Sequence, residues 1–218
     1  MLRYLLRRAG QALVVLVGAA VLVFFLLQLV PGDPVRAAMG TRFNPEAYEE
    51  LIAATGLDRP LHEQLISYLA GAATGDFGIS FRNGESVFDL VVGRMPATIS
   101  LAVTALVIAL LISFPLGILS AMRRGTLVDH VARLGSQIGI SVPDFWLGIL
   151  LILLFTSVLE RLPPSGYVPL TEDPLEWLRH VILPALAVGL ISGSILTRFI
   201  RSATLESNDQ DFARTARA

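Results

Sequence analysis

The chain has 218 residues, of which 54% are hydrophobic and only 16% are charged, whereas soluble domains usually carry about 25% charged residues. This balance predicts an integral membrane protein. The net charge of −1 provides no basic field of the kind that attracts nucleic acid. The lack of cysteine excludes disulfides, cysteine-based zinc sites and thiol catalysis.

Four apolar stretches are long enough to cross a bilayer core of about 30 Å, which takes roughly 20 apolar residues in a helix. They lie approximately at residues 11–30, 97–122, 134–159 and 181–200. Because lipid offers the backbone no hydrogen-bond partner, we expect all four to be helices. Residues 1–10, which precede the first stretch and contain three arginines, are interpreted as an interfacial helix on the cytoplasmic side. A cleaved signal peptide is the alternative, but no small-residue cleavage site follows, and a retained helix is favoured.

Residues 31–96 form one long loop on the outer side, between the first and second spans. Asn44, followed by a proline, is a typical helix start, and Gly56 is a typical stop. Apolar residues at helical spacing predict a second helix from Leu61, and a capping pattern at Ser86 suggests a third. We therefore expect two or three short helices at the outer membrane surface.

No catalytic or metal-binding constellation stands out in the sequence. The three histidines, at positions 62, 130 and 180, are too scattered to suggest a metal site, and His62 is interpreted as a surface residue of a loop helix. The chain has no phosphate-binding GxxxxGK[ST] loop. We expect no catalytic residue, no metal site and no cofactor bound by this chain.

The third span contains an acid, Asp144, about 15 Å along a helix that starts at Leu134. A carboxylate inside a membrane is a functional candidate. Pro143, directly before it, is expected to kink or break the helix. If the apolar run instead begins at Phe145, Asp144 lies at the interface, so both depths stay open. Ser141, Pro143 and Asp144 are candidate residues of a pathway or a helix break.

The fourth span adds three candidates of the same kind, Pro184, Ser192 and Gly193. Small residues either let helices approach closely or leave backbone lining a path, and close packing is the favoured interpretation for any single one. The second span has its own proline and glycine, Pro115 and Gly117. Together these features indicate a bundle around a pathway.

Arginine placement orients the chain. With four spans both ends share one side, which holds ten arginines in short segments beside the spans, against seven on the other side. Five of those seven lie in the long loop, and long loops translocate largely regardless of charge. The two ends, including the closing sequence DFARTARA at 211–218, are therefore predicted to be cytoplasmic.

Several short motifs occur in order along the chain. They are GLDRPLHEQ (56–64), YLAGAATGDFGISF (68–81), RMPATISL (94–101), SVPDFWLG (141–148), LPPSG (162–166), LPALAVG (183–189), TRFIRSATLE (197–206) and DFARTARA. The series resembles the inner-membrane permease subunits of binding-protein-dependent ABC importers, in the class that handles dipeptides, oligopeptides and nickel. The resemblance extends from the first span to Ala218.

The resemblance implies an all-α integral membrane fold, with four helices present of a six-helix type I ABC importer permease bundle. It also implies a cytoplasmic coupling helix after the fourth span, with a Glu-Ala-Ala pattern and a later glycine. Here the pattern falls on Arg214, Thr215 and Ala216, and the glycine would lie two residues past Ala218. We expect the motif and two further spans to continue beyond this sequence.

The start of that coupling helix is assigned to residues 209–218. Alanines such as Ala216 would offer a small face to a partner's groove, and polar residues would hold the register. The candidate coupling residues are Asp211, Phe212, Arg214, Thr215, Ala216 and Arg217. Two earlier arginines, Arg198 and Arg201, are expected to anchor the inner end of the fourth span at the lipid headgroups.

The resemblance implies a subunit that does no chemistry and forms half of a translocation pathway for peptides or similar small solutes in the inner membrane. Its expected partners are a second homologous permease subunit, two ATP-binding subunits that carry ATP and magnesium, an extracytoplasmic substrate-binding protein and the lipid bilayer, with no nucleic acid. The alternatives are a secondary transporter or channel subunit, and a membrane-anchored interaction or enzyme module that uses the outside loop. One candidate acid and no evident repeat count against the first alternative, and the lack of a catalytic constellation counts against the second.

Overall fold

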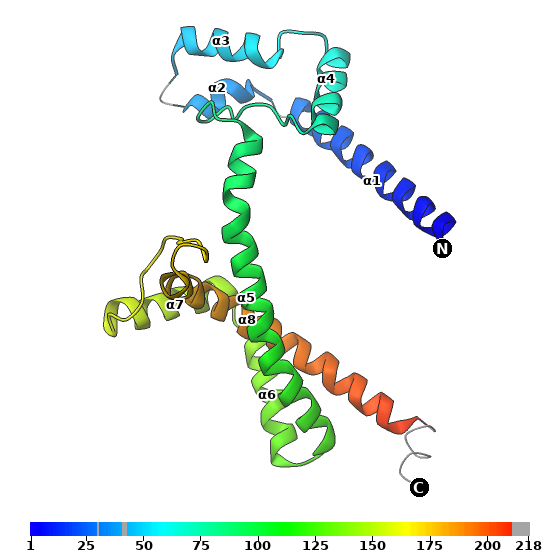
Figure 1. Cartoon of the computed structure of the whole chain (residues 1–218), viewed down its shortest axis with the longest axis vertical. Coiled ribbons are helices and arrows are strands. Elements are labelled where there is room, and N and C mark those ends of the chain that lie inside the picture. Colours follow the sequence, from blue (N-terminus) through cyan, green and yellow to red (C-terminus); the bar gives the residue numbers. More distant parts are fainter. Residues whose placement is uncertain (30, 41–42, 211–218) are drawn as a thin grey trace. The chain divides into compact units, whose positions relative to one another are not determined.

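The computed structural model describes residues 1–29, 31–40 and 43–210 of the chain (Figure 1). Most of these residues lie in helices and none lies in a β-strand, although one isolated β-bridge joins Ile79 and Ser86. The predicted all-α membrane fold is therefore confirmed. The chain divides into two compact units, Met1–Arg94 and Met95–Ala218.

The first unit begins with α1 (Leu2–Leu29), a continuous helix that takes in both the basic start and the first apolar stretch. None of its residues is buried, as expected for a helix that lipid surrounds. Three short helices follow in the loop: α2 (Pro34–Met39), α3 (Pro45–Thr55) and α4 (Leu61–Thr74). Rings of Phe24 on α1 and Tyr68 on α4 stack with their centres 6.0 Å apart.

The caps of α3 are those that the sequence predicts. The Asn44 side chain accepts a hydrogen bond from the Glu46 amide, and Gly56 ends the helix in the left-handed conformation with φ 68°. The short helix expected from Ser86 is instead the start of α5 (Val87–Met122), which runs on without interruption through the second apolar stretch.

One helix in the loop, α2, was not predicted from the sequence. It begins at Asp33, whose carboxylate accepts hydrogen bonds from the amides of Val35 and Arg36. The Tyr48 hydroxyl on α3 donates to the same carboxylate. This hydroxyl, followed by the Arg36 amide, holds the pKa of Asp33 below its usual value, while the carboxylate raises the pKa of Tyr48. Asp33 therefore both caps α2 and ties it to α3.

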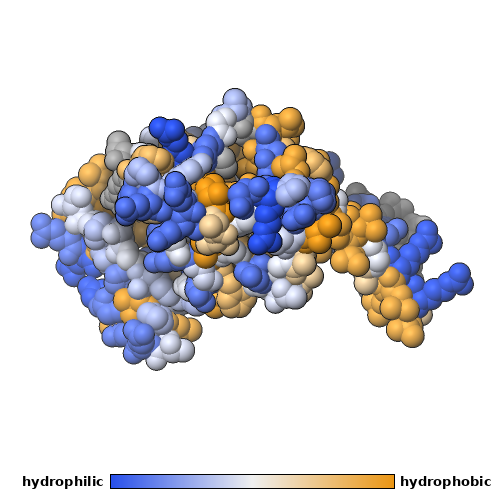
Figure 2. Space-filling view, turned by 90° about the horizontal axis from the view of Figure 1, so that it is seen from above, coloured by the Kyte–Doolittle hydropathy of each residue, from blue (hydrophilic) through white to orange (hydrophobic). Residues whose placement is uncertain are grey.

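The second unit contains the rest of α5 and the helices α6 (Leu127–Ser141), α7 (Asp144–Ile152), a π-helical turn (Leu153–Val158) and α8 (Pro174–Asp209). Many large apolar side chains on these helices are exposed. Figure 2, a view of the whole chain from above, shows hydrophobic residues (orange) at the surface beside hydrophilic ones (blue). Three helices of the described chain, α1, α5 and α8, are long and apolar enough to cross a membrane.

The predicted third span is not one straight helix. α6 ends at Ser141, Val142 and Pro143 are extended, and α7 begins at Asp144, so that the chain turns by 93°. Proline has no amide hydrogen and disfavours helical geometry in the residue before it, which explains the break. The structure has four spans only if this bent pair counts as one.

α5 and α8 pack through a row of small residues at every fourth position, which we call the small-residue seam. On α5 the row is Ala105, Ala109, Ser113, Gly117 and Ala121, and on α8 it is Ala185, Gly189, Gly193 and Thr197. A Cβ atom on Gly189 would lie 2.9 Å from the Ala105 carbonyl oxygen, and one on Gly193 would lie 3.3 Å from the Ala109 Cα. The two backbones can approach this closely only because the side chains between them are small.

The seam leads to a prediction about glycine substitutions. Gly189→Ala should lower the free energy of unfolding of the detergent-purified protein by about 1–3 kcal/mol, because the new methyl group overlaps backbone and Ile108 atoms. Gly135→Ala on α6 is the matched control. Nothing lies within 4 Å of its added methyl group, so helix propensity should leave it neutral or stabilise it by up to about 1 kcal/mol. Equal destabilisation of the two variants would contradict the seam.

Candidate functional site

The inner ends of α5, α6 and α8 meet around one buried carboxylate, that of Asp129. The chain leaves α5 at Met122 and makes a short turn in which Gly125 has φ 78°, a conformation that favours glycine. It then enters α6, and Asp129 lies in the first turn of that helix. Only 1% of Asp129 is exposed.

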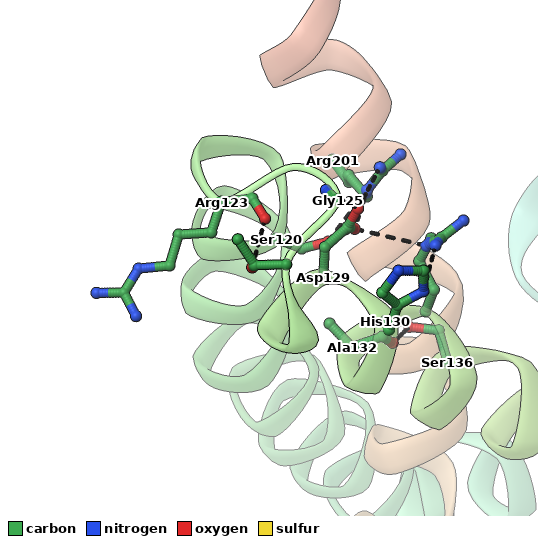
Figure 3. Close-up of polar contacts among 10 residues, drawn as sticks. Ser120, Arg123, Gly125, Asp129, His130, Ala132, Ser136 and Arg201 are labelled. Carbon is green, nitrogen blue, oxygen red and sulfur yellow. Dashed lines mark hydrogen bonds and ion pairs between the residues drawn. The ribbon is translucent and has the colours of Figure 1, made fainter.

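Three groups from three parts of the chain donate hydrogen bonds to Asp129 (Figure 3). Arg201 on α8 binds it through two nitrogens, with Nε 2.8 Å from Oδ1 and Nη2 3.0 Å from Oδ2. The Ser120 hydroxyl on α5 donates to Oδ1 at 2.7 Å, and the Gly125 amide donates to Oδ2 at 3.0 Å. We call this set of four residues the inner junction.

Arg201 reaches the junction because it continues the small-residue seam. It follows Thr197 by four residues on α8, so it occupies the next position of the same row, and its Nε also lies 3.1 Å from the Ser120 hydroxyl oxygen. The expectation that Arg201 anchors the span at lipid headgroups was therefore wrong. A second arginine, Arg133, lies at the edge of the junction with its Nε 3.6 Å from Asp129 and its side chain 48% exposed.

The junction fixes helices rather than providing reactive groups. A buried ion pair is costly to desolvate, and it is tolerated where hydrogen bonds satisfy both charges, as they do here. Because the donors come from α5, α8 and the turn before α6, separating any one of these elements would remove one of the hydrogen-bond partners of the buried carboxylate. Among the residues that the structure describes, no group of three His, Asp or Glu side chains is placed to hold a metal ion.

The sequence did not single out Asp129, because it precedes the third apolar stretch and looks like one of several interfacial acids. Its partner lies 72 residues away in the chain, and such a pairing leaves no local pattern. One pattern in the sequence does point to the pairing. The four-residue spacing of Gly189, Gly193 and Thr197 continues to Arg201, which places this arginine on the same face of α8.

Three of the residues that the sequence proposed for a pathway or helix break gather at the turn between α6 and α7. Ser141 is the last residue of α6, Pro143 lies in the break and Asp144 starts α7, and all three are exposed. Asp144 accepts a hydrogen bond from the amide of its neighbour Phe145. These residues do not contribute to the inner junction.

The other three candidates lie along α8. Gly193 is buried in the small-residue seam and Ser192 is half-buried beside it. Pro184 is exposed, and α8 continues through it, so it does not break the helix as the sequence had suggested. The six candidate coupling residues, from Asp211 to Arg217, lie outside the described residues.

Comparison with known proteins gives matches along the whole chain. Residues 1–102 match the family described as the N-terminal part of the binding-protein-dependent transport system membrane component. Residues 113–218 match the family described as the binding-protein-dependent transport system inner membrane component.

Two curated relatives are similar over nearly the full chain. A protein of Brucella abortus (strain 2308) named as a peptide transport system permease is 39% identical over 214 residues, which cover 98% of this chain and 68% of the relative. The dipeptide transport system permease protein DppB of Escherichia coli (strain K12) is 36% identical over 242 residues, covering 100% of this chain and 71% of the relative.

The inner junction can be tested by removing one charge. Arg201→Gln should lower the free energy of unfolding of the purified protein by about 3–5 kcal/mol, because it leaves the buried Asp129 carboxylate without its main partner. Arg133→Gln removes an exposed arginine at the edge of the same carboxylate and should cost less than about 1 kcal/mol. Denaturant titration of the two variants measures the difference. A loss for Arg201→Gln no larger than that for Arg133→Gln would show that the junction does not hold the helices.

Proposed function

The chain belongs to the family of binding-protein-dependent transport system inner membrane components, and from this premise we propose how it works. Members of this family are transporter permeases and not catalytic enzymes. The chain is a permease subunit of an ABC importer, and it crosses the inner membrane several times. The family depends on a substrate-binding protein and on ATP-binding proteins as partners.

The proposed substrates are peptides or similar small solutes. The observation that carries this proposal is the similarity, over 98% of the chain, to a protein named as a peptide transport permease. In the proposed assembly the chain forms half of the pathway and pairs with a second homologous permease subunit. An extracytoplasmic binding protein delivers the solute, and two ATP-binding subunits bind ATP and magnesium and hydrolyse the nucleotide.

Coupling to those subunits is assigned to residues 209–218, on sequence grounds. α8 ends at Asp209, where this segment begins. Arg201 lies eight residues earlier, about 12 Å along the helix axis. In this proposal, movement of the coupling segment displaces α8. The inner junction transmits this displacement to α5 and to the turn before α6. The three helices then move together, and the break at Pro143 is where α7 can turn relative to them.

The buried charge pair raises the question of a secondary transporter, in which intramembrane charges bind coupling ions near the bilayer midplane. Asp129 and Arg201 do not have that position. They lie beside the turn that carries the exposed Arg123 and Arg124, on the side that the arginines assign to the cytoplasm. Every acceptor of the Asp129 carboxylate is also already in use. This geometry favours a structural junction.

The coupling assignment predicts the effect of a bulky charge at Ala216. Ala216→Glu should abolish co-purification of the ATP-binding subunit with the permease, because a small face is needed to enter a partner's groove. Ala203→Glu, on an exposed position of α8, adds the same side chain outside the proposed coupling segment and should leave co-purification unchanged. If the Ala216 variant retained its ATP-binding subunit at the control level, residues 209–218 would not be the coupling segment.

A further inference from the structure

A groove of about 540 Å³ runs along the side of the second unit, between α6 and α8. Its walls are His130, Arg133, Leu134 and Gln137 of α6, and Arg198 and Ser202 of α8. The four α6 residues have the spacing of one helical face. The guanidinium of Arg201 forms part of its floor, where it is already bound to Asp129.

The groove carries an excess of positive charge. Three arginines line it, and the carboxylate that two of them contact, Asp129, is saturated by the donors of the inner junction. Arg133 contacts that carboxylate only from 3.6 Å, and its Nη2 lies 2.8 Å from His130 Nδ1. Arg198 is exposed and forms no ion pair with any acid in the described part of the chain. An anion in the groove could therefore accept hydrogen bonds from at least two guanidinium groups, those of Arg133 and Arg198.

The position of the groove suits the headgroup layer of a membrane. It begins about one helical turn beyond the loop that joins α5 and α6, on the side that the arginines assign to the cytoplasm. Arg198 lies eleven residues before the end of α8, about 16 Å along the axis. The groove is therefore on the flank of the helices and not at their ends, which is where an ATP-binding subunit would dock.

Apolar residues continue from the groove into the membrane region. Leu134 lines the groove and is 64% exposed, and Ile138, one helical turn further along α6, is 65% exposed. The surface is thus basic at one end and apolar at the other, which matches a molecule with an anionic head and hydrocarbon chains.

We propose that this groove binds the phosphate headgroup of an anionic phospholipid of the cytoplasmic leaflet. Arg133 and Arg198 bind the phosphate oxygens, and the acyl chains lie along Leu134 and Ile138. Basic pockets between membrane helices on the cytoplasmic side are suited to such headgroups. The bound phosphate offsets the repulsion among the three arginines, so the lipid stabilises the packing of α6 against α8 beside the inner junction.

The importer is assembled with its partner subunits and purified from native membranes in mild detergent. The phosphatidylglycerol and cardiolipin that co-purify with it are then quantified. Arg198→Gln should reduce the anionic lipid retained per complex by about fivefold, the effect of one basic residue at a membrane surface. Arg198→Lys keeps the charge and should retain most of it. Arg124→Gln is the matched control, since this exposed arginine lies on the turn and not in the groove.

Three results would overturn the proposal. Equal loss of lipid from Arg198→Gln and Arg124→Gln would indicate diffuse attraction to the surface. Binding of radiolabelled inorganic phosphate to the delipidated wild-type complex, lost in Arg198→Gln while lipid retention stays unchanged, would make free phosphate the ligand. Release of the ATP-binding subunit from Arg198→Gln with unchanged lipid would make the groove a protein-docking site.

Discussion

The arrangement of the second unit depends on the close approach of the α5 and α8 backbones. Lipid hydrocarbon is as apolar as leucine, so burial alone does not drive two helices together in a membrane, and van der Waals contact must supply the attraction. Residues without bulky side chains at every fourth position allow that contact, and a Cβ on Gly189 or Gly193 would disturb it. The same spacing then brings Arg201 to Ser120 and Asp129, where the seam ends in a bidentate ion pair.

This arrangement suggests a mechanical route by which the permease responds to the ATP-binding partners proposed for it. In the proposed coupling, force applied to α8 near Asp209 needs a stiff path into the membrane, and α8 offers one because it is bound to α5 along the seam and to α6 at the inner junction. The extended residues at Val142 and Pro143 interrupt that stiffness between α6 and α7. The basic groove beside the junction adds a site at which membrane composition can influence the same helices.

Much of this architecture could be predicted from the sequence. Long apolar runs predict membrane helices, the caps at Asn44 and Gly56 give the bounds of α3, and ordered motifs indicate the family. The rest depends on long-range packing. Arg201 near the end of a span looks like a headgroup anchor, because nothing local marks its pairing with Asp129. Pro143 and Pro184 have the same local chemistry, yet the chain breaks at the first, whereas α8, packed against α5, continues through the second.

The central claim is that α5 and α8 remain joined along the seam while the importer works. These 218 residues contain no cysteine, so none of them can react in place of an introduced pair. Ala105 and Ala185 belong to one buried cluster, and the pair Ala105→Cys and Ala185→Cys should form a disulfide in the assembled importer under mild oxidation, with and without ATP. Transport should persist after cross-linking, and a control pair that uses the exposed Ala102 in place of Ala105 should not react. Cross-linking in only one nucleotide state, or loss of transport once the disulfide forms, would show that the seam opens during the cycle and would contradict the claim.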